Sequence, residues 1–283
     1  MIAIVLCLEA VNGGNLLGFS GNAVHGFWMN HWQHINPTFF KHIHSPKQSQ
    51  PFSLSPIMNL PRPEQGIVKV EKGKDVWFRV NALSEELESL LINEWLTRLP
   101  NEISIAGLSW RVTKIITRNQ ENEWAGGFHP QALAETFLLQ KDPPSSWRLE
   151  FHTPTTFHSE SGQLPIPLPG LLVSSWLRRW QEFGPILLPE NLPDRIRSDC
   201  VVRAYDLKTI PARDSRRLVI GCVGTLEIEA LHLIPGERAA LDLLAAYSFW
   251  SGSGQYTTQG FGMTQLANCS QKVENGRPLG KDS

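Results

Sequence analysis

The sequence predicts an α+β protein made of two tandem ferredoxin-like domains, each with the element order β-α-β-β-α-β. The chain has 283 residues, and about 150 residues per domain gives two domains. Residues 141–146 read Lys-Asp-Pro-Pro-Ser-Ser, and two prolines that lack a backbone donor are typical of a linker. The predicted domains are therefore residues 1–142 and 143–283.

Hydrophobic periodicity defines the elements of the first half. An apolar strand over residues 2–8 is followed by Val24, Trp28 and Trp32 at helical spacing. Asn36-Pro37 is a cap followed by a first-turn proline, which predicts a short second helix carrying Phe40 and Ile43. Alternating residues then predict strands, and Ser84 is the N-cap of a helix that ends near Leu99. The strands of this half are expected at residues 2–8, 52–58, 76–80 and 103–117.

The second half repeats this rhythm without a close sequence repeat. Strand residues alternate over 147–153, and Leu172, Trp176 and Trp180 mark one side of a helix over residues 170–183. The remaining elements are expected at residues 200–207 (strand), 217–234 (strand), 239–250 (helix) and 261–267 (strand).

Composition excludes several classes of protein. Hydrophobic residues make up 41% of the chain and charged residues 19%, the balance of a folded protein. A formal net charge of −1 argues against a uniformly basic protein that coats nucleic acid. The four cysteines form no CxxC pair, so a zinc knuckle or a redox dithiol is unsupported. Residues 2–8 are too short for a signal peptide and no apolar run spans a membrane, so we expect a cytoplasmic protein without a membrane partner.

Charge is distributed unevenly along the chain. Residues 10–63 contain no Asp or Glu, yet they include five histidines, which are His25, His31, His34, His42 and His44. A polyanion near this surface would explain the gap, because a carboxylate would repel phosphate. The alternative is a neutral region half buried among aromatic side chains. A metal site is a further alternative, but hydrolytic metal sites usually include a carboxylate.

His44 is the histidine best placed for proton transfer. It precedes the turn Ser45-Pro46-Lys47, and loop residues can approach a ligand. A pKa near 6.5 suits proton transfer at neutral pH. Lys47 could stabilise charge that develops on a phosphate in the transition state. For His31 and His34 we expect a structural or merely exposed role.

Two segments of the second half could contact phosphate. Residues 252–263 contain Gly252, Gly254, Thr258 and Gly260, but the order helix, loop, strand fits neither a dinucleotide fingerprint nor a Walker A loop. Their amides could approach phosphate, or the glycines could form a tight connection. Residues 195–217 carry seven cations against three aspartates, and Arg178 and Arg179 are expected on the polar side of their helix. The alternative is a solvated loop with internal ion pairs. The arginines of this segment are Arg195, Arg197, Arg203, Arg213, Arg216 and Arg217.

Four motifs together resemble those of the CRISPR repeat-processing endoribonucleases, in the repeat-associated mysterious protein superfamily. They are His25-Gly26, His44 with Phe52-Ser53-Leu54-Ser55-Pro56, the strand Phe151–Phe157, and the loop Gly252–Met263. The resemblance implies tandem ferredoxin-like domains and cleavage without a metal cofactor. In that family the 2′-hydroxyl next to the scissile phosphate attacks the phosphorus, which leaves a cyclic phosphate and a free 5′-hydroxyl. It also implies that His44 is the general acid or base, with Lys47 as support.

Other assignments stay open under this resemblance. Met29 stands where the family often has a tyrosine, so His25 or His42 could fill a catalytic role. The expected partner is CRISPR repeat RNA, as precursor and as mature guide, and subunits of a CRISPR effector complex could bind as well. The protein could be a monomer or a homodimer. A non-cleaving RNA-binding subunit of an effector complex is the alternative function.

Overall fold

The computed structural model describes residues 1–43, 49–159, 162–213 and 218–267. The chain divides into two compact units. Unit 1 comprises residues 1–127, 211–219 and 256–261, and unit 2 comprises the remainder. Each unit is described by itself below.

Unit 1 is built on an antiparallel sheet with β1 (Ile2–Ala10) at its centre. Strand β1 pairs with β5 (Asp75–Ala82) on one side and with β7 (Leu108–Ile116) on the other. The edges are β3 (Phe52–Leu54) and β6 (Glu102–Ile105). The order β3-β5-β1-β7 places the second, third, first and fourth strands of the β-α-β-β-α-β pattern side by side. This is the order of a ferredoxin-like sheet.

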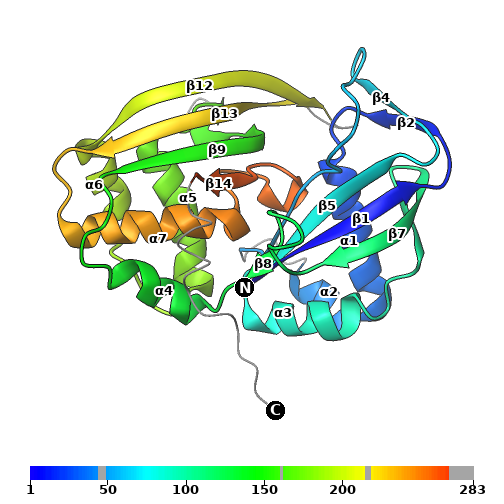
Figure 1. Ribbon diagram of the computed structural model, residues 1–283, viewed down its shortest axis with the longest axis horizontal. Coiled ribbons are helices and arrows are strands. Elements are labelled where there is room, and N and C mark those ends of the chain that lie inside the picture. The colour runs from blue at the N-terminus through cyan, green and yellow to red at the C-terminus, as the bar shows by residue number, and fades with distance from the viewer. Residues whose placement is uncertain (44–48, 160–161, 214–217, 268–283) are drawn as a thin grey trace. The chain divides into compact units, whose positions relative to one another are not determined.

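The helices of unit 1 cover one face of this sheet (Figure 1). Helix α1 (Gly21–Ile35) buries Trp28 and Trp32, and α2 (Pro37–Ile43) follows directly. Helix α3 (Glu85–Leu90) begins at the N-cap Ser84 and continues as a π-helical turn, η1 (Leu91–Trp95). Trp28 lies 5.5 Å from Trp32 and 5.1 Å from Trp95, measured between ring centroids. These indole rings form part of the core between the helices and the sheet.

Unit 2 repeats the arrangement. Its sheet has the order β12-β13-β9-β14, again the second, third, first and fourth strands. The predicted tandem ferredoxin-like fold is therefore confirmed. Helices α5 and α7 lie on one face of this sheet (Figure 1). The bounds are β9 (Ser146–Thr155), β12 (Cys200–Arg213), β13 (Leu218–Ala230), β14 (Thr264–Leu266), α5 (Pro169–Phe183) and α7 (Pro235–Ser251).

Several elements were not predicted. Residues 103–117 form the hairpin β6-β7, and not one strand, because Ala106 and Gly107 adopt left-handed conformations that reverse the chain. The residues between β1 and α1 contain β2 (Gly14–Leu17), which pairs with β4 (Ile67–Val70). The remaining additions are β8 (Gly126–Gly127), α4 (Pro130–Leu138), β10 (Phe157–Ser159), β11 (Gly162–Leu164) and α6 (Leu192–Asp199).

The chain first passes from unit 1 to unit 2 between Gly127 and Phe128. The predicted boundary at residues 142 and 143 lies after α4, inside unit 2. Side chains on both sides of it bond to one carboxylate of α7, since Gln140 Nε2 and Trp147 Nε1 each donate to Asp242 at 2.9 Å. The proline-rich segment therefore packs within unit 2. No helix of the described residues is both long and apolar enough to cross a membrane.

Candidate functional site

Residues 252–263 form the glycine-rich segment, and its middle packs against the start of α1 within unit 1. His25 Nδ1 lies 2.8 Å from the Thr258 carbonyl oxygen. Because a carbonyl only accepts, Nδ1 carries the proton in this hydrogen bond. The His25 ring also stacks on Phe52 of β3, with 6.2 Å between ring centroids. His25, β3 and residues 256–261 thus meet at one place.

Glycines permit this close approach. A Cβ on Gly21 would overlap the Gln259 carbonyl oxygen. A Cβ on Gly260 would lie 2.9 Å from both the Gly21 Cα and the Pro56 nitrogen, and Gly260 has a φ of +85°. Only glycine fits at both positions. The backbone of the segment therefore lies directly against the first turn of α1 and the residues after β3.

An apolar cluster holds the end of the β12-β13 hairpin in unit 1. Ala212, Val219 and Phe261 are buried together, with Phe19 and Tyr256 packed against them. The rings of Phe19 and Phe261 are 4.6 Å apart. Arg213 follows Ala212 directly and is exposed. The cluster therefore places Arg213 next to a turn that also contacts His25.

In unit 2, buried hydrogen bonds fix both ends of the glycine-rich segment. Trp176 Nε1 donates to Ser253 Oγ at 2.8 Å, and Thr264 Oγ1 donates to the same oxygen at 2.7 Å. Thr153 Oγ1 accepts from the Met263 amide at 2.9 Å. The predicted strand motif around residues 151–157 thus bonds directly to the predicted glycine-rich motif.

Arg179 is a buried residue that the sequence analysis placed wrongly on the polar side of α5. Its Nη1 donates to the Ser251 carbonyl oxygen at 2.8 Å. Burial lowers its pKa to about 10, so the guanidinium keeps its charge at neutral pH. Only the packing of α5 against α7 reveals this role, because neighbouring arginines in a sequence look alike. Arg179 anchors the end of α7, where the glycine-rich segment begins.

The amides of the glycine-rich segment are partly used inside the protein. The Gly252 amide donates to the Ser248 carbonyl oxygen at 2.8 Å, and the Gly254 amide donates to Ser175 Oγ at 3.1 Å. The amides of these two positions are therefore bonded within unit 2. Thr258 is half-buried.

The remaining catalytic candidates lie at or beyond the end of α2. His42 is exposed, with its ring 6.4 Å from that of Phe39. His44 and Lys47 lie outside the described residues, and so do Arg216 and Arg217.

Three of the predicted RNA-binding arginines are ion-paired within unit 2. Arg195 in α6 lies 2.8 Å from Asp199 and 2.9 Å from Glu237. The hydrogen bond from Arg195 lowers the pKa of the Glu237 carboxyl. Arg197 pairs with Asp194 at 2.9 Å, and Arg203 lies 3.6 Å from Glu227. The segment is a helix and a strand, not a loop, but the predicted internal ion pairs are present.

The other histidines of residues 10–63 have structural contacts. His31 Nε2 lies 3.3 Å from the Trp95 carbonyl oxygen, and burial lowers the pKa of His31. His34 Nδ1 donates to the Asn30 carbonyl oxygen, one turn back in α1. Across the described part of the chain, His, Cys, Asp and Glu side chains form no group of three that could hold a metal ion.

Comparisons with known proteins agree with the motifs. Residues 149–264 match the family model of the CRISPR-associated endoribonuclease Cas6. A product complex of Cas6 from Thermus thermophilus has a TM-score of 0.78 and 22% identity, over 94% of this chain and 99% of that chain. A second Cas6 product complex has a TM-score of 0.75 and 26% identity, over the same shares. A protein described as "An RAMP protein binding different RNA substrates" has a TM-score of 0.59 and 17% identity, over 95% of this chain and 100% of that chain.

The search of curated proteins finds no match. The family model covers the third and fourth motifs of the sequence analysis, whereas the histidines of residues 10–63 lie before it. The structural matches extend over both halves. The resemblance to the CRISPR repeat-processing endoribonucleases is therefore confirmed.

Proposed function

Because the chain is similar to CRISPR repeat-processing endoribonucleases in the sequence of its second half and in the fold of both halves, we propose that it cleaves CRISPR precursor RNA within its repeats. The similarity to this family supports the activity of an RNA endonuclease that processes CRISPR transcripts. We further propose that cleavage needs no metal ion and that the protein stays bound to its product, a mature guide RNA.

The observation that carries the proposal is that the sequence motifs contact one another within each unit. In unit 1, His25 contacts Thr258 and Phe52, so the first, second and fourth motifs meet. In unit 2, Thr153 bonds to Met263, so the third and fourth meet. Within each unit, motifs more than a hundred residues apart in the chain therefore contact one another.

The proposed reaction is an internal transfer at the scissile phosphate. The 2′-hydroxyl oxygen attacks the adjacent phosphorus, and the bond from phosphorus to the 5′ oxygen breaks. A general base takes the 2′-hydroxyl proton, and a general acid protonates the leaving 5′ oxygen. The products are a cyclic phosphate and a free 5′-hydroxyl. We assign proton transfer to His44 and electrostatic support to Lys47, with His25 and His42 as the candidates for the second group.

RNA binding is assigned to the turn around Thr258 and Gly260 and to the end of the β12-β13 hairpin. Arg213 is exposed beside the apolar cluster that holds this turn. An arginine fork can bind a phosphate through two hydrogen bonds. Arg195 is held by two carboxylates, so the structure favours Arg213 over Arg195 as a phosphate contact.

The test is incubation of the purified protein with labelled repeat RNA in EDTA, followed by analysis of the product ends. We expect one cleavage within the repeat, a cyclic phosphate on the upstream product and a 5′-hydroxyl on the downstream product. Loss of cleavage in EDTA with recovery on adding Mg²⁺ would contradict the metal-independent reaction. RNA that is bound but uncut in both conditions would favour the non-cleaving subunit.

A further inference from the structure

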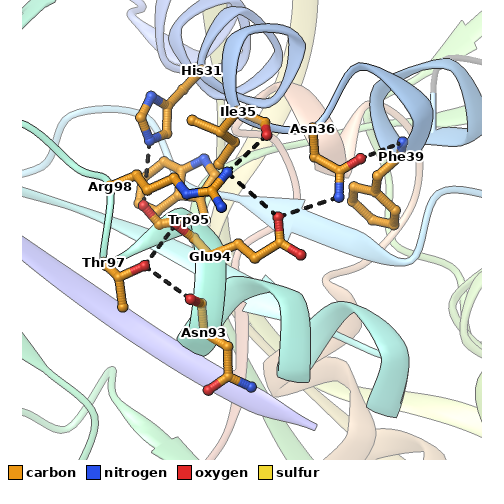
Figure 2. Close-up of polar contacts among 9 residues, drawn as sticks. All are labelled: His31, Ile35, Asn36, Phe39, Asn93, Glu94, Trp95, Thr97 and Arg98. Atoms are coloured by element: carbon orange, nitrogen blue, oxygen red, sulfur yellow. Dashed lines mark hydrogen bonds and ion pairs between the residues drawn. The ribbon is translucent and has the colours of Figure 1, made fainter.

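The junction between α1 and α2 is held by a carboxylate from another part of unit 1. Asn36 joins the two helices, and its Nδ2 donates to Glu94 Oε2 at 3.3 Å. Arg98 Nη1 lies 3.8 Å from the same oxygen and donates to the Ile35 carbonyl oxygen at 2.9 Å. Figure 2 shows Glu94 between the Asn36 amide and the Arg98 guanidinium. Residues 10–63 contain no carboxylate, and here η1 supplies one.

The Asn36 side chain has two partners that require opposite ends of its amide. Its Oδ1 accepts from the Phe39 amide at 3.0 Å, which caps the first turn of α2. Its Nδ2 donates to Glu94. The Glu94 carboxylate can only accept, so it fixes which way the amide points and keeps Oδ1 toward α2. A helix of seven residues depends on such a cap, because it has few bonds of its own.

The π-helical turn places Glu94 and its neighbours for this role. The Leu96 amide bonds to the Leu91 carbonyl oxygen, five residues back, at 3.0 Å. The Leu99 amide bonds to Leu96, which leaves the Trp95 carbonyl oxygen to accept from His31 Nε2 of α1 at 3.3 Å. Two consecutive residues of η1 thus hold α1 and the start of α2. π-helical turns are often found at functional sites.

We propose that Glu94 is a positioning residue for cleavage, which acts by orienting Asn36 and so setting the direction of α2. Ile43 is the last residue of α2, and His44 follows it in the chain. This inference rests on the proposed function, since it gives the clamp of Glu94 and Asn36 a role in placing the proton-transfer residue. Glu94 acts through Asn36 and does not itself touch RNA.

The experiment reverses the donor and the acceptor of the clamp. Asn36→Asp keeps an oxygen to cap Phe39 but turns a second carboxylate toward Glu94, which repels it. Adding Glu94→Gln to this variant supplies an amide that donates to the new carboxylate. The control is Asn93→Asp, an identical change at an exposed neighbour whose amide donates to Ser89 and not to Asn36. The readouts are the cleavage rate at saturating protein, the Kd for repeat RNA and hydrogen exchange of the amides of residues 39–43.

We expect Asn36→Asp to lower the saturated cleavage rate about 10- to 100-fold, the range in which displacement of a reacting group acts, while the Kd is unchanged. The double variant recovers most of the rate and the amide protection, and Asn93→Asp behaves as wild type. If Asn36→Asp is unfolded by circular dichroism, Glu94→Ala takes its place, since it leaves the cap residue intact.

Wild-type cleavage by a single variant that has lost amide protection would overturn the inference, and so would a double variant with restored protection and no restored rate. The proposed function fails separately, if wild type does not cleave repeat RNA at all. The hydrogen-exchange readout still reports on the clamp in that case, because it needs no RNA.

Discussion

His25 in α1 and Arg195 in α6 belong to the two regions whose sequences suggested a polyanion partner, residues 10–63 and residues 195–217. Arg195 is held between Asp199 and Glu237. His25 donates to the Thr258 carbonyl oxygen, and His31 and His34 also bond to backbone carbonyls. A carboxylate neutralises a cation, whereas a carbonyl orients a side chain without cancelling its charge. A count of charges along a chain therefore does not say which cations remain available to a ligand.

The largest effect is expected from a substitution at His44, the proposed proton-transfer residue of residues 10–63. His44→Ala should lower the cleavage rate by about 10²- to 10⁴-fold, the usual contribution of general acid-base catalysis, and leave the Kd for repeat RNA nearly unchanged. The measurement is single-turnover cleavage beside a binding titration. His34→Ala is the control, because His34 is exposed and its Nδ1 donates to the Asn30 carbonyl oxygen within α1. Cleavage that survives His44→Ala would move the role to His25 or His42.

A smaller effect is expected from alanine substitutions at two glycines of α1, Gly21 and Gly26, which should change the free energy of unfolding in opposite directions. Gly21→Ala should lower the free energy of unfolding by about 1–3 kcal/mol, the usual cost of overpacking, because its Cβ would overlap the Gln259 carbonyl oxygen. Gly26→Ala should raise it by about 0.5–1 kcal/mol, because an exposed helical alanine meets nothing within 4 Å there. Urea denaturation followed by tryptophan fluorescence checks both. Equal effects at the two positions would show that the segment does not pack on α1.

The smallest effect is expected in the salt dependence of RNA binding, which should differ between substitutions of Arg213 and Arg195. Arg213→Ala should make the dependence of log Kd for RNA on log salt shallower by about 0.7–0.9, one phosphate contact. Arg195→Ala should leave that slope unchanged and lower the free energy of unfolding slightly, because surface ion pairs contribute little. Filter binding over a salt series measures the slopes. An altered slope for Arg195→Ala alone would reverse the assignment.

The stability change of Arg195→Ala should also depend on pH. Arg195 lowers the pKa of Glu237 in the folded state, so the pair stabilises the protein above the carboxyl's ordinary pKa. That contribution is lost as the pH falls through the lowered pKa, where Glu237 gains a proton. The difference between Arg195→Ala and wild type should therefore be full at neutral pH and shrink in acid.

Local patterns predicted the elements that depend on neighbouring residues. The Asn36 cap and the Ser84 cap are both present, because capping is decided within one turn. The strand register and the extra elements were not predictable in the same way. The pairing of β2 with β4 joins residues about fifty positions apart, and no local period encodes such a contact. Arg179 was misplaced for the same reason, because its partner Ser251 is distant in the chain.

The sequence alone predicted the strands and helices of the two β-α-β-β-α-β patterns, the repetition of that pattern and the motifs that resemble a family of RNA-processing enzymes. These follow from periodicity, capping and residue type, which act over a few positions. Only the tertiary structure decided that Arg195 is paired, that His25 meets Thr258 and that Glu94 holds Asn36. Each of these joins residues brought together by packing, and the burial and partners that set a side chain's role arise only when the sheet and its helices have formed.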